Sequence, residues 1–290
     1  MRPIRLAFSP DADDLFMFWP LLSGHVDAGG LSFEHERVET EALNARAESS
    51  DGPDVCAVSI AQMPAIAERY LLLPHGGSVG RAYGPVVVAR RPMKLEELAG
   101  KRVAVPGLRT TAHLVLRLLV DDATHGGAYL PVEVKITPFD RVFAALRDGE
   151  VEAALLIHEG RLTYVDDPSL HRVVELGESW HAMTKLPLPL GGNVVKRALG
   201  DDVIARVSEA CRASIAWSLA HRERVIDAVI DSGVRDDAKL TRARLDRYLA
   251  MYANADSAGY DDETKRAIVE LLARGAEKGF VARSRVEFAP

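Results

Sequence analysis

The sequence predicts an α/β fold, and three observations support this class. Short runs rich in Val, Ile and Leu alternate with helical patterns through the first two-thirds of the chain. From about Asp201 onward the pattern is helical. Hydrophobic residues make up 48% of the 290 residues, which is enough for a sizeable core. Strands that alternate with helices are typical of βαβ units, so we expect largely parallel sheets.

The expected strands are short β-rich runs, most of them bounded by polar, Gly or Pro residues. In chain order they are 4–9, 31–36, 54–59, 70–74, 85–90, 102–106, 132–137, 153–158, 172–177 and 191–196. Amphipathic segments between them predict helices at 111–122 and 139–150. The tail predicts further helices within 201–232, 244–253 and 262–280, and Gly279 is placed to end the last one.

Composition excludes several classes of function. The formal net charge is −6 and no Lys/Arg run is present, so we expect no nucleic-acid partner. No apolar run approaches the ~20 residues of a membrane helix, and the N-terminus meets acidic residues too early for a signal peptide. Cys56 and Cys211 form no metal-spaced motif. We therefore expect a cytoplasmic protein; its oligomeric state is not predicted.

Several expected strands end in a residue that is able to cap the following helix. Ser9 follows the first strand, Ser59 follows "CAV", and Thr110-Thr111 follow "VAVPGLR". Ligands of open α/β sheets lie beyond the carboxyl ends of strands. Helix N-termini there offer unpaired N–H groups that suit carboxylates. One such residue alone is more often an ordinary N-cap, whereas several converging ones predict a cleft for a small carboxylic acid.

The segment "AALLIHEGR" (153–161) runs from five apolar residues directly into His158. A zinc-protease motif needs a second His four residues later, where Leu162 stands, so we expect no metal here. The simpler interpretation is a structural histidine at a strand end. The functional interpretation is a general base, because an imidazole ordinarily titrates near 6.5 and the end of a buried strand faces ligands.

Three other features give a weaker indication of function. Asp13 and Asp14 are adjacent, and neighbouring residues of a helix point in different directions, which favours cap and surface charges. The glycine-rich segment 75–85 is not a P-loop, and it fits either a flexible connection or a backbone that closes over a ligand. The segment "KLPLPLGG" (185–192) predicts a turn or a crossing between lobes.

Taken together, "VPGLRTTAHLVLRLL", "GEVEAALLIHEGRLTY", "VVELGESW", "LPLPLGG" and "YANADS" resemble the 1,4-dihydroxy-6-naphthoate synthases of the futalosine route to menaquinone. The resemblance spans nearly the whole chain. It implies a two-lobed fold similar to the type II periplasmic binding proteins, with a central cleft. The first lobe would hold residues 1–88 and 193–290, and the second would hold residues 89–192.

The resemblance also implies roles for individual residues. His158 matches the proton-accepting base of the family, and the substrate-binding residues would be Ala57, Val58, Ser59, Thr111 and Ala112. Two departures concern the substrate. Family members often carry Lys where Ala57 stands, and Asp11–Asp14 replace most of a Cys-Pro-Asn-Asp segment.

The function expected from this resemblance is a carbon–carbon lyase. It would convert cyclic dehypoxanthine futalosine, a small-molecule carboxylate, to 1,4-dihydroxy-6-naphthoate without metal, flavin or nicotinamide. Two alternatives stay open. One is chorismate dehydratase, an earlier step of the same pathway, although "IHEGR" is typical of the naphthoate branch. The other is a cytoplasmic binding protein that closes on a small acid without turnover.

Overall fold

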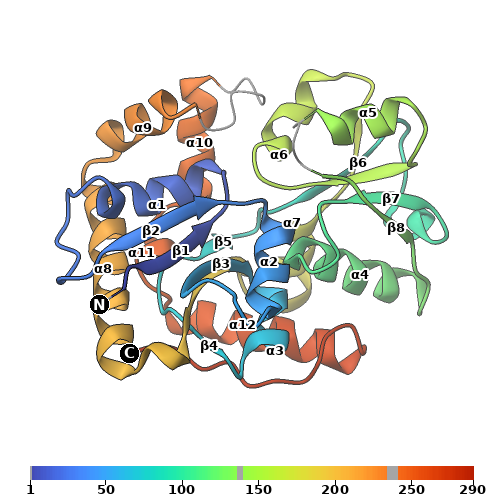
Figure 1. Cartoon of the computed structure of the whole chain (residues 1–290). Helices are drawn as coiled ribbons and strands as arrows, with labels where there is room; N and C mark the ends of the chain where they lie inside the picture. Colours follow the sequence, from blue (N-terminus) through green and yellow to red (C-terminus); the bar gives the residue numbers. More distant parts are fainter. Residues whose placement is uncertain (1, 136–139, 234–240) are drawn as a thin grey trace.

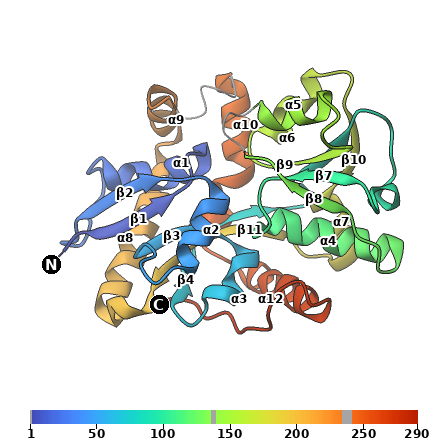
Figure 2. The same cartoon turned by 45° about the vertical axis from the view of Figure 1, so that its right-hand side comes forward.

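A computed structural model describes residues 2–135, 140–233 and 241–290. Two β-sheets lie side by side, and helices cover both (Figures 1 and 2). The blue N-terminal strands and the orange C-terminal helices share one half of the molecule, while the green middle of the chain forms the other half (Figure 1). The expected α/β class is confirmed.

The first sheet has the strand order β2-β1-β3-β11-β4, and β5 pairs with β11 as well. Its strands are β1 (Ile4–Phe8), β2 (Phe33–Arg37), β3 (Val55–Ser59), β4 (Tyr70–Leu72), β5 (Ser78–Gly80) and β11 (Leu188–Lys196). β1 is parallel to β2 and β3, whereas β11 is antiparallel to its three neighbours. β5 lies inside the glycine-rich segment, where no strand was expected, and β11 contains most of the expected turn "KLPLPLGG".

The second sheet has the strand order β10-β6-β9-β7-β8. Its strands are β6 (Val86–Ala89), β7 (Arg102–Val105), β8 (Leu130–Glu133), β9 (Ala153–Leu156) and β10 (His171–Glu175). β6 and β9 are buried at every position, which matches their uninterrupted apolar sequences. Part of the strand expected at 132–137 lies outside the described residues.

The expectation of largely parallel sheets is wrong, because both sheets are mixed. Parallel pairs occur where a helix carries the chain back over the sheet, as from β1 through α1 to β2. Antiparallel pairs occur where the chain enters or leaves a sheet: β6 runs antiparallel to β9, and β11 runs antiparallel to β3. Strand–helix alternation indicates the elements but not these returning connections.

Helices flank both sheets. The α-helices are α1 (Ala12–Leu22), α2 (Thr40–Glu48), α3 (Met63–Ile66), α4 (Thr111–Thr124), α5 (Arg141–Arg147), α6 (Gly160–Thr163), α7 (Leu176–Thr184), α8 (Asp201–Ala220), α9 (Arg222–Asp231), α10 (Arg242–Tyr252), α11 (Ala255–Ala258) and α12 (Asp262–Glu277). Short 3-10 turns lie at η1 (Ile60–Gln62), η2 (Leu95–Leu98), η3 (Tyr164–Asp166) and η4 (Arg197–Leu199). The helical tail is as expected, and Gly279 follows α12 with a φ of 68°. Within the described residues, no helix has the length and apolar character to span a bilayer.

The tail helices return to the N-terminal half of the chain. α1 packs against α8, α9 and α10, so the first and last parts of the sequence share one core. The chain passes to the second sheet before Val86 and returns before Leu188. The expected lobe boundaries at 88/89 and 192/193 therefore fall inside β6 and β11. Below, the first lobe and the second lobe mean the parts of the chain built on the first and second sheets.

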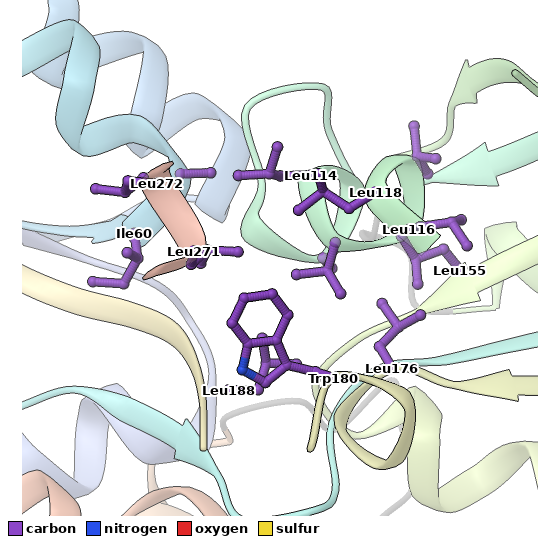
Figure 3. Close-up of a cluster of buried hydrophobic side chains, with 14 of the residues drawn as sticks. Ile60, Leu114, Leu116, Leu118, Leu155, Leu176, Trp180, Leu188, Leu271 and Leu272 are labelled. Carbon is purple, nitrogen blue, oxygen red and sulfur yellow. The ribbon is translucent and has the colours of Figure 1, made fainter. Parts of the chain in front are cut away.

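One apolar cluster joins the two lobes. Trp180 of α7 lies among leucines from both of them (Figure 3). Leu271 and Leu272 come from α12, and Leu114 comes from α4. α12 contacts β11 in the first sheet and also α4, which belongs to the second lobe. This shared core fixes the two lobes against each other.

Candidate functional site

A cavity of about 750 Å³, its open mouth included, lies where the two lobes meet. Strand ends and helix starts surround it: the end of β3, the start of α4 and the segment after β9. The six residues that the sequence singled out all line this cavity. They are Ala57, Val58, Ser59, Thr111, Ala112 and His158. Four come from two strand ends and two from one helix start, as the strand-end argument expected.

The start of α4 supplies one wall. Thr110 caps the helix, since its side chain accepts a hydrogen bond from the backbone N of His113. The hydroxyl of Thr111 instead donates to the carbonyl of Leu190 (2.6 Å) and accepts from the backbone N of Ala61 (3.1 Å). Thr111 and Ala112 occupy the first two positions of the helix, where backbone N–H groups have no intrahelical partner. These amides are placed to receive an anion.

Ser59 is not an ordinary cap, because its side chain makes no capping bond to η1. Its backbone N instead donates to Oδ1 of Asn44 (2.9 Å), and its Oγ accepts from Nδ2 of Asn44 (3.1 Å). Asn44 belongs to α2 and is fully buried. The Ser59 amide is thus already occupied, and what Ser59 offers the cavity is its hydroxyl hydrogen. The sequence reasoning missed Asn44, and no local motif marks it.

Asn193 is another lining residue that the sequence reasoning missed. It stands on β11 opposite Ala57 of β3 and is 1% exposed. Its Nδ2 donates to the carbonyl of Gly76 (2.9 Å). Its Oδ1 is buried without a hydrogen-bond partner among the residues the structure describes. A buried acceptor of this kind at a cavity wall is suited to a ligand hydroxyl or N–H group.

His158 follows β9 in a left-handed backbone conformation, with a φ of 49°. Such a φ is uncommon for a residue other than glycine and occurs often at functional sites. The side chain is 17% exposed, so the ring is held at the cavity wall rather than in solvent. Its Nδ1 lies 3.4 Å from the hydroxyl of Tyr248, and its Nε2 lies 3.4 Å from Oγ1 of Thr40 and 3.3 Å from Oδ2 of Asp11.

The expectation that Asp13 and Asp14 are cap and surface charges is wrong. Both are buried and both line the cavity. Asp14 accepts from the backbone N of Ser9 (2.7 Å), and Asp13 accepts from the hydroxyls of Ser78 (2.8 Å) and Tyr248 (3.1 Å). The helix α1 packs against α8, α9 and α10, and every residue of its first turn is buried. Periodicity on a single helix cannot reveal that enclosure.

Burial perturbs both carboxyls. It raises the pKa of Asp13, and the negative charge of Asp11 adds to that effect. Burial, followed by the charge of Asp13, raises the pKa of Asp14 to about 8. Both shifts arise because the charged form loses hydration beside other carboxylates. The cavity wall therefore holds two carboxyl groups whose ionisation is disfavoured by their surroundings.

The rest of the "IHEGR" segment anchors the histidine loop. Glu159 is fully buried. Arg161 is also largely buried, donates through Nε to the carbonyl of Gly84, and lies 3.8 Å from Glu175. Gly84 belongs to the stretch that enters the second sheet, so Arg161 ties the loop to the crossing. No group of three or more His, Cys, Asp or Glu side chains in the described ranges is arranged to hold a metal ion.

The architecture matches solved proteins that have the periplasmic-binding-protein fold. A Candida albicans gene product with the generic periplasmic binding protein fold superposes with a TM-score of 0.70, at 14% identity and with 98% of this chain and 92% of that chain covered. The alkanesulfonate-binding protein of Xanthomonas axonopodis pv. citri gives a TM-score of 0.70 at 13% identity, with 97% and 94% covered. At such identities the likeness shows the fold alone, and that fold is the two-lobed periplasmic-binding-protein fold.

Sequence comparison is more specific. The model of a family described as menaquinone biosynthesis matches residues 4–277. Two proteins named 1,4-dihydroxy-6-naphthoate synthase are similar over nearly the whole chain. The one from Thermus thermophilus is 38% identical, with 98% of both chains covered, and the one from Streptomyces coelicolor is 34% identical, with 96% and 94% covered. A solved Archaeoglobus fulgidus protein is 37% identical with a TM-score of 0.86, covering 96% and 98%. The chain belongs to this menaquinone biosynthesis family.

Proposed function

We propose that this protein is a 1,4-dihydroxy-6-naphthoate synthase, a lyase that converts cyclic dehypoxanthine futalosine to 1,4-dihydroxy-6-naphthoate. One observation carries the proposal: in a chain of the menaquinone biosynthesis family, the six residues singled out from the sequence line a single cavity. The names of the two curated relatives support the same reaction. The position of that cavity between two lobes suits a reaction that must exclude water.

The substrate carboxylate would bind at the start of α4. The backbone N–H groups of Thr111 and Ala112 and the Ser59 hydroxyl are the donors available there. Ala57 and Val58 would give the adjoining strand wall, with no lysine to add a charge. The positive end of the helix dipole then supplies most of the attraction for the anion.

His158 would act as the general base. In its neutral form it removes a proton from the substrate, and the electron pair left behind drives the elimination that separates the naphthoate from the sugar-derived fragment. Asp11, 3.3 Å from Nε2, lies where it would pair with the imidazolium that forms. We place the reaction in the cytoplasm as part of the same proposal, and the free, buried state of Cys56 and Cys211 is compatible with a reducing compartment.

The test combines substrate conversion with one substitution. Purified protein is incubated with cyclic dehypoxanthine futalosine, and in parallel with chorismate, and the naphthoate product is followed by its absorbance after chromatography. We expect product from the first substrate alone. His158→Asn should lower kcat by a factor on the order of 100–10,000, because Asn cannot accept the proton near neutral pH.

His125→Asn provides a matched control. His125 is an exposed residue with a φ of 54°, and Asn tolerates this left-handed region about as well as His does. Both variants should therefore keep near-normal melting temperatures, and only His158→Asn should lose turnover. A near-normal rate in His158→Asn would eliminate His158 as the base. Tight binding without product by the unsubstituted protein would favour a binding protein over an enzyme.

A further inference from the structure

A chain of hydrogen-bonding groups in the cavity wall connects the second lobe with the first. Nδ1 of His158 lies 3.4 Å from the hydroxyl of Tyr248. That hydroxyl donates to Oδ1 of Asp13 (3.1 Å), and Oδ2 of Asp13 accepts from the hydroxyl of Ser78 (2.8 Å). Tyr248 is 1% exposed and Asp13 is 6% exposed, so water does not compete for these groups.

The members of this chain come from distant parts of the sequence. His158 follows β9 in the second lobe, whereas Tyr248 stands on α10 and Asp13 stands on α1, in the first lobe. Thr40 and Asp11, which lie near Nε2, also belong to the first lobe. The imidazole is thus carried by one lobe and contacted by polar groups of the other. Its orientation depends on how the lobes are packed together.

The direction of the hydrogen bonds decides which ring nitrogen carries the proton. A phenol has a single hydrogen, and that of Tyr248 is directed to Asp13. The oxygen of Tyr248 is then able to act toward His158 only as an acceptor, which requires an N–H at Nδ1. Burial raises the pKa of Asp13, yet even a protonated carboxyl keeps one carbonyl oxygen to accept from Tyr248.

With the proton on Nδ1, Nε2 keeps its lone pair and is able to accept a proton; the Thr40 hydroxyl, 3.4 Å away, is a donor that is able to face this lone pair before substrate binds. We propose that Tyr248 and Asp13 are positioning residues that hold His158 as the Nδ1-protonated tautomer and so make Nε2 the basic nitrogen. This inference rests on the proposed role of His158 as the base. Beyond that role, the inference names Nε2 as the nitrogen that accepts the proton and names Tyr248 and Asp13 as the residues that determine this choice. Because Tyr248 and Asp13 belong to the first lobe and His158 to the second, the tautomer of His158 also depends on the contact between the lobes.

The substitution that tests this inference is Tyr248→Phe, which removes the hydroxyl and keeps the ring. Tyr70→Phe is the matched control: Tyr70 is equally buried in the first lobe, its hydroxyl donates to the carbonyl of Pro53 (2.7 Å), and it does not line the cavity. Each variant loses the hydrogen bond that its buried hydroxyl donates, and Tyr248→Phe loses in addition the contact with Nδ1 of His158. A purely structural role for Tyr248 would therefore make the two variants behave alike.

The first readout is the nitrogen NMR spectrum of protein labelled with ¹⁵N at histidine, recorded well above the ordinary imidazole pKa of ~6.5. The signals of His158 are assigned among those of the nine histidines by comparison with His158→Asn. We expect an Nδ1-protonated ring in the unsubstituted protein and in Tyr70→Phe. In Tyr248→Phe the proton should shift toward Nε2, where Asp11 lies. A ring protonated at Nε2 in the unsubstituted protein would overturn the inference.

The second readout is turnover. Tyr248→Phe should keep KM within a few-fold and lose up to about 100-fold in kcat, the scale of a misplaced catalytic group. Tyr70→Phe should keep both constants. A kcat for Tyr248→Phe within twofold of the unsubstituted protein would also count against the inference. Because the NMR readout needs no substrate, it still decides the tautomer if the proposed reaction itself fails.

Discussion

At the scale of single residues, the buried carboxyls of Asp13 and Asp14 lower the stability of the folded state. Two adjacent acidic side chains are enclosed by apolar helices, with Asp11 nearby. A buried carboxylate without a cationic partner destabilises the folded state. Side chains with strongly shifted pKa values in a cleft are typical of functional sites, where stability is given up for chemistry.

The pH dependence of stability provides a test of this cost. The folded-state pKa of Asp14 is raised to about 8 from an ordinary value of 3.8, so ionisation above pH ~4 penalises the folded state more than the unfolded state. The favourable contribution of the protonated form is thus fully present below pH ~4 and is lost as pH rises through ~8. Asp14→Asn cannot ionise and still offers an acceptor to the backbone N of Ser9.

We therefore expect the stability of Asp14→Asn, relative to the unsubstituted protein, to improve by a few kcal/mol between about pH 5 and about pH 8.5. Urea unfolding at the two pH values measures it. Asp51→Asn, at a side chain that is 91% exposed, is the control and should show no comparable trend. Parallel pH profiles for Asp14→Asn and the unsubstituted protein would contradict the raised pKa.

These residues also show where sequence reasoning succeeds and where it stops. Ser59, Thr111 and His158 were found because each stands at a strand end or a helix start, and such positions are visible in local patterns. Tyr248 and Asn193 were missed because their place in the cavity depends on which helix and which strand return to the first sheet. Asp13 and Asp14 were misjudged because their burial comes from α8, α9 and α10, which lie in the last third of the chain.

At the scale of elements, local sequence patterns indicate most strands but not the segments by which the chain returns to the first sheet. Nearly every expected strand is present, yet β5 and the first half of β11 come from segments that looked like loops. Their glycines and prolines are tolerated because β11 is a long strand with a pairing irregularity between Pro189 and Gly191. Local propensity depends only on the residue types of the segment, whereas the pairing of β11 with β3, β4 and β5 depends on the tertiary structure.

The start of α4 is joined to these returning elements through one hydroxyl. Thr111 connects the carbonyl of Leu190 on β11 with the amide of Ala61 in η1, so the helix start is fixed against two segments of the first lobe. Thr124, at the other end of α4, makes a similar pair: its hydroxyl donates to Val120 and accepts from the amide of Gly127. The two threonines differ in one respect: Leu190, a partner of Thr111, lines the cavity, whereas the partners of Thr124 do not.

Substituting valine for each threonine separates stability from binding. Thr111→Val and Thr124→Val each leave one amide without its acceptor, and each should lower the free energy of unfolding by about 1–3 kcal/mol. Thr111→Val alone should raise the KM for the substrate, because the anion-binding amides of α4 are then no longer fixed. Denaturant unfolding and steady-state kinetics measure the two effects. Equal KM values for the two variants would show that the Thr111 tether does not position the helix start.

At the scale of the whole molecule, the two lobes are not independent bodies. Trp180 is enclosed by leucines of α4 and α12 (Figure 3). The guanidinium of Arg274, also on α12, lies 6.0 Å from the centre of the Trp180 ring. α12 belongs to the C-terminal tail, while Trp180 belongs to the second lobe. Because one core spans both lobes, loosening α12 removes packing from each of them.

Leu271→Ala tests that coupling. Leu271 is fully buried in the shared core, and its truncation should cost about 2–5 kcal/mol, whereas Val269→Ala, at a residue that is 58% exposed, should change stability by about 0.5 kcal/mol or less. The tryptophans report each lobe separately, since Trp180 lies in the second lobe and Trp19 and Trp217 lie in the first. We expect the fluorescence transitions of variants that keep only Trp180, or only Trp19 and Trp217, to have coincident midpoints and to shift together in Leu271→Ala. Midpoints that separate, with one lobe keeping its original stability, would mean that the lobes fold as independent units and that the site between them is assembled by docking rather than by a common core.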